Sequence, residues 1–328
     1  MIKKYWFFIG IAGVIGIAFY LPEVGRFIRT YKILNSGIFV AFLLTGLSLE
    51  TSSLFNQLKN IKVLSAALIS SLIFFPVIAY YLGQTIYKDW VDFAIGTLII
   101  GVAPVTIASG TVMTAMALGN VPLSLFICVL GNLFSLLTIP FMVNLLLQMG
   151  DVSIQLPVLQ MLMGLTLKVL IPTLIGQLLQ PWLKSKITPF KQSISIFNQS
   201  IVLMIILNAV SSSTDRILES GSILFSIFLF MIVLHIFMIA VNKTLAGLIG
   251  LDLPSTAAFT IHTSQKTLTI SYIVWAGYFA SEYPMGLIPA IAYHLTQMIM
   301  DTFLAQWFRR KIERPTSNFE FEKMKKQK

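Results

Sequence analysis

Two short polar stretches interrupt otherwise apolar segments of this chain, and they hold most of the residues that can do chemistry. The first runs from Ala103 to Asn120, where Pro104 removes a backbone donor and Gly110 loosens the chain. The second is His262-Thr-Ser-Gln-Lys-Thr-Leu268. In hydrocarbon, unpaired backbone is tolerated only where it is buried in protein or lines a cavity. The stretches therefore predict a substrate or ion site built on broken membrane helices, with these candidate residues: Thr106, Ser109, Gly110, Thr111, Thr114, His262, Thr263, Ser264, Gln265, Lys266 and Thr267.

Lys266 is the most informative of these residues, because an ammonium group inside a bilayer is rare and usually functional. Such a fixed charge can attract an anionic substrate or occupy the place of a transported cation. The competing explanation is a lysine that snorkels to an interface, but Lys266 lies near the centre of its apolar segment.

Five other ionisable residues in apolar segments bear on function. Lys168 either has a functional role or forms an ion pair between helices. Asp301 either forms a structural pair with a lysine or relays protons. His262 and His294 titrate near neutral pH, so each is a candidate carrier of a coupling proton. His235 has apolar neighbours and is expected to be a hydrogen-bonded packing residue.

A polar stripe follows the first broken stretch at three- and four-residue spacing. It consists of Ser124, Cys128, Asn132 and Ser135. It either lines a cavity or is a small-residue surface for helix packing. Cys128 is the only cysteine, which excludes an internal disulfide.

The composition predicts an all-α polytopic membrane protein. Hydrophobic residues make up 56% of the 328 residues, charged residues 11%, and the mean hydropathy is +0.84. Soluble domains carry about 25% charge. The net charge of +10 lies in short loops and in the C-terminal tail, which is typical of membrane topology and not of nucleic-acid binding. No catalytic motif or cofactor site is visible, so we expect no enzyme.

Ten apolar segments are long enough to span a bilayer, which requires about 20 residues. The first is interpreted as a retained helix, since no cleavage motif follows it. The fourth and ninth contain the two broken stretches. The segments are about 5–22, 34–50, 63–83, 92–118, 121–147, 157–179, 195–212, 222–248, 255–278 and 285–308.

The distribution of basic residues among the loops predicts that both termini lie in the cytoplasm. The protein itself is expected in the inner or plasma membrane. This arrangement places 15 basic residues inside and 5 outside. Arg26, Arg29 and Lys32 are a local exception on the outside. The basic tail, residues 309–328, is expected to be disordered and to anchor the topology or touch anionic lipid.

The matching breaks predict two inverted repeats of five helices. Residues 1–150 form the first repeat and residues 151–308 the second, so each break falls in the fourth helix of its half. An odd number of spans inverts the second copy, and the broken helices then cross near the midplane.

The same residues resemble the bile acid:sodium symporter family along nearly the whole chain. The motifs are Ala103-Pro104, Val112-Met113-Thr114, Gly119-Asn120 with Ser124, and the tract Val169 to Gln177. Ser264 to Leu268, with Tyr293-His294, looks like the bacterial branch related to the seventh human member. The resemblance implies a panel domain, a core domain, alternating access and sodium-coupled uptake of an organic anion.

The resemblance also places the family's sodium ligands on residues of this chain. Its Ser-Asn pair falls on Gly110-Thr111, its next hydroxyls on Ser124 and Cys128, and a glutamine on Ser71. Its glutamate falls on Ile261 or His262, and a second glutamine on Gln265 or Lys266. Because a carboxylate is lost and an ammonium gained, coupling to two sodium ions is not expected. One sodium near Thr111, Ser124 and Gln265, a proton, or no coupling ion are the alternatives.

The leading functional prediction is a secondary transporter of a small organic anion. An exporter of the arsenite or auxin-carrier type is a second hypothesis. A membrane regulator of ion homeostasis without transport is a third, from a different class. The sequence predicts membrane lipid as a contact and no nucleic-acid partner.

Overall fold

The computed structural model describes residues 2–49, 61–106, 108–149 and 156–326, and all regular secondary structure in these residues is helical. This confirms an all-α protein. The boundary expected between the two repeats, at residues 150 and 151, lies outside the described residues.

Within the described residues, four helical segments are long and apolar enough to cross a membrane: Ile61–Ile86, Val121–Gln148, Val158–Ser211 and Ser222–Leu248. A further candidate is Trp6–Tyr20 with Pro22–Thr30, a pair bent by 94°. These lengths indicate a polytopic membrane protein. The helices are α1 (Ile2–Tyr20), α2 (Pro22–Thr30), α3 (Ile33–Ser48), α4 (Ile61–Ile69), α5 (Phe75–Ile86), α6 (Val91–Val102), α7 (Ala108–Met116), α8 (Val121–Gln148), α9 (Val158–Leu165), α10 (Ile171–Ile187), α11 (Lys191–Ser211), α12 (Thr214–Ser220), α13 (Ser222–Leu248), α14 (Leu253–Ser264), α15 (Leu268–Tyr278) and α16 (Ile288–Lys326).

Both expected helix breaks are present. The first separates α6 from α7, and Pro104 lies between them. The second separates α14 from α15, where Gln265 and Thr267 have extended backbone. The polar composition of the two stretches therefore identified the unwound segments correctly.

Two π-helical turns precede prolines in other spanning segments. Turn η3 (Ser70–Phe74) joins α4 to α5 just before Pro76, and turn η4 (Thr166–Leu170) joins α9 to α10 just before Pro172. Proline has no N–H and crowds the preceding turn, so a wider turn relieves the clash and leaves a carbonyl without its helical donor.

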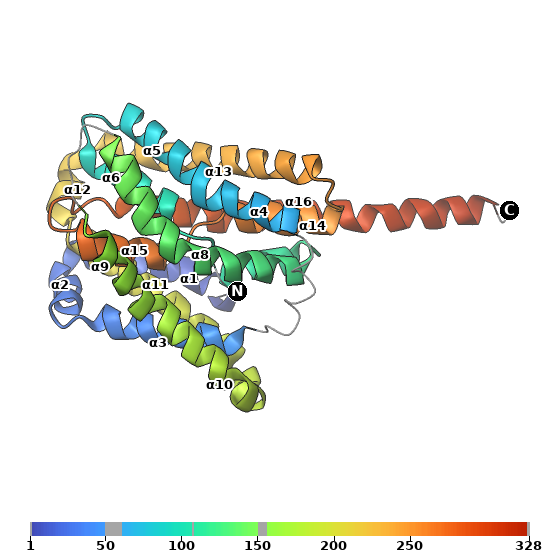
Figure 1. Cartoon of the computed structure of the whole chain (residues 1–328), viewed down its shortest axis with the longest axis horizontal. Helices are drawn as coiled ribbons and strands as arrows, with labels where there is room; N and C mark the ends of the chain where they lie inside the picture. Colours follow the sequence, from blue (N-terminus) through green and yellow to red (C-terminus); the bar gives the residue numbers. More distant parts are fainter. Residues whose placement is uncertain (1, 50–60, 107, 150–155, 327–328) are drawn as a thin grey trace.

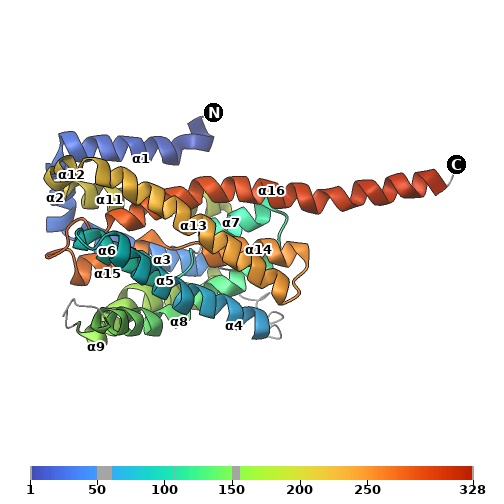
Figure 2. The same cartoon turned by 90° about the horizontal axis from the view of Figure 1, so that it is seen from above.

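The helices form two groups that pack mainly within themselves. In one group α3 packs on α10 and α11, and α11 also packs on α1 and α2. In the other, α14 packs on α7, α8, α13 and α16, while α6 packs on α5 and α16. Helices α2 and α12 lie at one end of the bundle, and α16 projects from the other end (Figures 1 and 2). The 3-10 turn η5 (Thr188–Phe190) separates α10 from α11.

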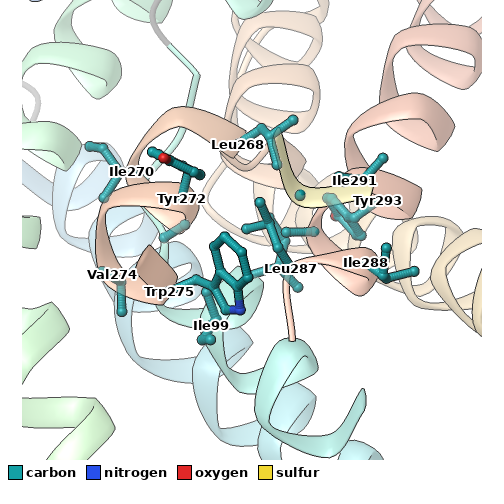
Figure 3. Packing of buried hydrophobic residues seen from close by; sticks show 14 of the residues in the cluster. Ile99, Leu268, Ile270, Tyr272, Val274, Trp275, Leu287, Ile288, Ile291 and Tyr293 are labelled. Carbon is teal, nitrogen blue, oxygen red and sulfur yellow. The ribbon is translucent and has the colours of Figure 1, made fainter. Parts of the chain in front are cut away.

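The largest buried core supports the second break. Trp275 of α15 is 1% exposed and belongs to the same buried cluster as Leu268, Leu287 and Ile288 (Figure 3). Its indole Nε1 donates to the carbonyl of Tyr283 at 2.8 Å, which satisfies its one polar atom. This packing fixes α15 against the start of α16.

The expectation of a disordered tail is wrong for residues 309–313, which continue α16. At the start of this extension the Arg309 Nε donates to the Glu313 carboxylate at 2.9 Å, one helical turn away. Pairs at this spacing stabilise a helix, and the composition argument overlooked them.

Close packing of α3 on α10 depends on glycine. A Cβ on Gly46 would lie 2.3 Å from the carbonyl oxygen of Thr173, and one on Gly176 would lie 2.3 Å from that of Leu43. The Gln177 amide, in addition, donates to the carbonyls of Gly46 and Leu49. Small residues are used in this way where membrane helices approach closely.

Gly46→Ala is therefore expected to destabilise the protein by about 1–3 kcal/mol, the usual cost of overpacking. The measurement is thermal unfolding of the purified protein in detergent. Gly13→Ala in α1 is the matched control, because a Cβ there meets nothing within 4 Å. Equal melting temperatures for the two variants would contradict the predicted contact.

Candidate functional site

The two unwound segments lie against each other. The Thr267 N–H donates to the carbonyl of Pro104 at 2.9 Å, which joins the breaks directly. The Asn132 side chain of α8 donates to the carbonyl of Val105 at 3.1 Å. Gln297 of α16 bonds both the N–H and the carbonyl of Lys266, each at 2.8 Å. Backbone that helix geometry leaves unpaired is thus satisfied by named partners.

The Lys266 ammonium is fully buried and bound by carbonyl oxygens. It donates to Ser71 O at 2.6 Å and to Gly101 O and Ala103 O at 2.8 Å each. It also lies 4.4 Å from the centre of the Phe75 ring, a distance at which a cation is attracted to an aromatic face. The side chain therefore does not snorkel to an interface.

Helix breaks explain why these three carbonyls are free. Gly101 and Ala103 are at the C-terminal end of α6, where Pro104 interrupts the helix. Ser71 lies in η3, and its π-helical donor would be Pro76, which has no N–H. A helix C-terminus also carries partial negative charge, so the position favours a cation.

Gln265 connects the first break to Asp301. Its Oε1 accepts from Thr106 and from Ser109, the latter at 3.0 Å. Its Nε2 donates to Asp301 Oδ2 at 2.6 Å. The Thr106 hydroxyl accepts in turn from the Gly110 N–H at 3.2 Å, which caps the start of α7.

Asp301 also pairs with His235, and the geometry locates a proton between them. Asp301 Oδ1 lies 3.0 Å from His235 Nε2, and His235 Nδ1 lies 2.9 Å from the Tyr293 hydroxyl. That hydroxyl donates to Ser264 O at 2.7 Å, so His235 Nδ1 must carry a hydrogen and donate. The Nε2–Oδ1 contact then requires a further proton, and the pair as a unit is neutral.

His235 was interpreted from the sequence as a hydrogen-bonded packing residue; it is buried and hydrogen-bonded, but its partners belong to this polar site. Asn242, seven residues or about two helical turns further along α13, is a residue that the sequence analysis missed. It donates to Ser264 Oγ at 2.9 Å and accepts from Ser70 Oγ at 2.6 Å. The available signal was the placement of both residues, seven positions apart, on one face of an apolar helix.

His262 faces the polar stripe of α8. Its Nδ1 lies 2.6 Å from Ser124 Oγ, which also accepts from the Thr114 hydroxyl at 3.1 Å. His262 Nε2 and the Thr263 hydroxyl are buried with no hydrogen-bond partner among the described residues. Cys128 is buried beside Asn132, with its sulfur 3.7 Å from the amide nitrogen. The stripe therefore packs against the break and does not border the cavity described next.

A cavity of about 240 Å³ lies where the two helix groups meet at the breaks. It is bordered by the first turns of α7 and α15, which supply Thr106, Ser109, Thr267 and Thr269. Within the described ranges no charged side chain lines it. Its other lining residues are Phe7, Ala41, Phe42, Thr45, Val112, Met113, Ser195, Asn198, Gln199, Ile201, Val202, Leu268, His294 and Met298.

Some of the predicted site residues thus border the cavity, and others form hydrogen bonds behind it. Thr106, Ser109, Thr267 and His294 border the cavity. Thr111 is half-buried in α7, and Lys168 lies elsewhere, beside a second cavity. The predicted sodium site stays a prediction: no hydrogen bond among the described residues links Ser124 to Gln265. The residues bonded behind the cavity are Gly110, Thr114, Ser124, His262, Ser264, Gln265, Lys266 and Asp301.

Comparison with known proteins identifies the family. The model of the SBF-like CPA transporter family matches residues 5–310. This chain belongs to that family. Its members are transporters, which agrees with the apolar helices and with the resemblance to the bile acid:sodium symporters.

Relatives of known name match most of the length of this chain. The probable sodium/metabolite cotransporter BASS4 of Arabidopsis thaliana chloroplasts is 29% identical over 320 residues, 90% of this chain and 71% of its own. The sodium/bile acid cotransporter 7 of Rattus norvegicus is 27% identical over 323 residues, 92% of each chain. The similarity to the seventh member of the bile acid cotransporters is thus confirmed.

The proton network gives a testable consequence for Tyr293. Tyr293→Phe removes the acceptor of His235 Nδ1 and the donor to Ser264 O, both buried. We expect a loss of about 1–3 kcal/mol of folding stability, measured by thermal unfolding, because each buried partner is left unsatisfied.

Tyr272→Phe is the control for this substitution. Tyr272 is 8% exposed, and its hydroxyl has no hydrogen-bond partner in the described part of the chain. A Tyr293→Phe protein as stable as the Tyr272→Phe protein would refute the network.

Proposed function

We propose that this protein is a secondary active transporter of a small organic anion that binds in the cavity between the two breaks. The observation that carries this proposal is the direction of the broken helices. Both α7 and α15 begin at the cavity, so two helix N-termini direct their positive dipole ends toward it. An anion can be held in this way without a charged side chain and can still leave.

The two helix groups support an alternating-access cycle. We assign α1, α2, α3, α9, α10 and α11 to a panel and the remaining helices to a core, and the breaks belong to the core. Ten spans in two inverted repeats, with the broken fourth and ninth spans crossing, are the corresponding topology. Both termini are assigned to the cytoplasmic side of the cell membrane by the charge rule.

Lys266 is assigned the role of a tethered cation. Three carbonyl oxygens at 2.6–2.8 Å resemble the oxygen shell that a hard cation requires, and here the ammonium occupies it. It follows that transport is coupled to fewer sodium ions than in a two-sodium symporter. The relatives' names include sodium, so one sodium ion remains a candidate for this chain.

A proton is the second candidate coupling ion, because His235 and Asp301 share one between Nε2 and Oδ1. The pair is joined through Gln265 to the hydroxyls that border the cavity. Movement of the shared proton would therefore change hydrogen bonding at the anion site. The exporter and the non-transporting regulator are not favoured by a comparable observation.

Thr267→Val tests the anion cavity with little effect on the fold. The Thr267 hydroxyl borders the cavity directly before α15 and makes no hydrogen bond to the described residues. We expect at least tenfold weaker binding of the anion that stabilises the wild type most in a thermal-shift series of pyruvate, succinate, citrate and taurocholate.

Thr85→Val is the control, because Thr85 is exposed on α5, away from the cavity. Unchanged anion affinity in Thr267→Val would place the substrate elsewhere. Failure of all four anions to stabilise the wild type would contradict this class of substrate.

Lys266→Ala tests the tethered cation. The three carbonyls would be left without their donor, and a small cation could then bind them. We expect a lower melting temperature that sodium chloride raises more than potassium chloride at equal ionic strength. The wild type should respond less to sodium.

Lys243→Ala is the matched control, because that ammonium lies 4.6 Å from the Trp307 ring, outside the carbonyl shell. If Lys266→Ala matched the wild type in transport and in its response to each cation, the assigned role of Lys266 would be excluded.

A further inference from the structure

A second cavity, of about 190 Å³, is bordered by three basic residues. These are Arg29, Lys32 and Lys168, which come from the end of α2, the residue before α3 and the turn η4. The amides of Asn35 and Asn208 and the ring of Tyr272 also border it. No carboxylate is present among the described lining residues.

None of these three cations forms an ion pair with a described residue. The carboxylates of Glu23, Asp92, Asp301 and Glu313 pair with other side chains. Arg29 also borders a neighbouring cavity that contains Asp215, but the two do not form a salt bridge. Lys168 is half-buried, and the helix–helix ion pair considered for it has no partner in the described part of the chain.

Like charges around one small space repel each other, and the half-burial of Lys168 increases the cost there, whereas Arg29 and Lys32 are exposed. An anion between them would remove this repulsion. A cavity lined by one sign of charge also concentrates ions of the opposite sign and raises their rate of association. The arrangement therefore fits a carboxylate or phosphate group better than a neutral ligand.

The second cavity continues the line of the first along the same three helices. On α3, Ile38 borders the second cavity and Ala41 the first. On α15, Tyr272 borders the second and Thr269 the first. On α11, Asn208 borders the second cavity and Val202 the first. About one or two helical turns separate the two cavities.

We propose that the second cavity is an anion-binding site that captures a carboxylate or phosphate group about one or two helical turns along the pathway from the uncharged cavity. Its place on a pathway rests on the proposed transport function, whereas anion binding there does not. The site also explains why Arg29 and Lys32 violate the charge rule on the outside: their charges serve binding. Helix α2, which supplies Arg29, lies at the end of the bundle away from the α16 extension (Figure 1).

The experiment measures binding of citrate and of inorganic phosphate by thermal shift at constant ionic strength, with the full-length protein in phosphatidylcholine nanodiscs. Lys168→Gln and Lys32→Gln are expected to weaken binding of at least one anion tenfold or more. Arg26→Gln is the matched control, because Arg26 lies on the same helix as Arg29, pairs with Glu23 at 3.3 Å and does not border this cavity.

A parallel series in nanodiscs with added phosphatidylglycerol separates a free anion from a lipid headgroup. Stabilisation by the anionic lipid alone, lost in Lys168→Gln, would assign the site to a headgroup phosphate. Stabilisation by citrate or phosphate in neutral lipid, lost in the same variant, assigns it to a soluble anion. No stabilisation in either series, or stabilisation unchanged in Lys168→Gln and Lys32→Gln, overturns the proposal.

Thr267→Val distinguishes this site from the substrate cavity. Anion binding that persists in Thr267→Val and fails in Lys168→Gln belongs to the second cavity, even if no variant transports the anion. Binding that fails only in Thr267→Val belongs to the first cavity and overturns the assignment to the second.

Discussion

Carbonyl groups released by helix breaks inside the membrane must find donors, and one ammonium group meets this need for three of them. Lys266 reaches Ser71 in a π-helical turn and both Gly101 and Ala103 at the end of α6. Without it, these carbonyls would be buried and unpaired, at about 1–3 kcal/mol each. The second break therefore holds the first in place, and the cavity between the two helix starts depends on this contact.

The charge of Lys266 is unusual because its surroundings are otherwise neutral. Asp301 is the one carboxylate in the polar network, and the proton that it shares with His235 cancels its charge. Gln265 then transmits the position of Asp301 to Thr106 by hydrogen bonds alone. A fixed cation at the carbonyl shell removes the electrostatic reason to bind a mobile one there, and on this ground we propose coupling to fewer than two sodium ions.

In the transport cycle that we propose, the two cavities present different chemistry to one solute. The cavity at the breaks offers hydroxyls and helix N-termini, which in that cycle bind an anion weakly enough to release it. The cavity beside α2 offers full positive charges, which favour capture. The shared walls on α3, α11 and α15 belong to both helix groups, so a shift of one group against the other would alter both cavities together.

The sequence by itself determined the membrane class, the family motifs and the location of both breaks. Hydropathy is a property of each segment by itself, and Pro104 and Gly110 alter the backbone at their own positions. These features can therefore be recognised without knowing which segments pack together. Only the tertiary structure decided which groups meet. His235 was assigned to packing because its partner Asp301 is 66 residues away. The proposed role of Lys168 depends on two other cations that border the same cavity, Arg29 at the end of α2 and Lys32 directly before α3. Side-chain periodicity identifies the face of a helix but not the helix opposite, because that depends on how all the segments pack.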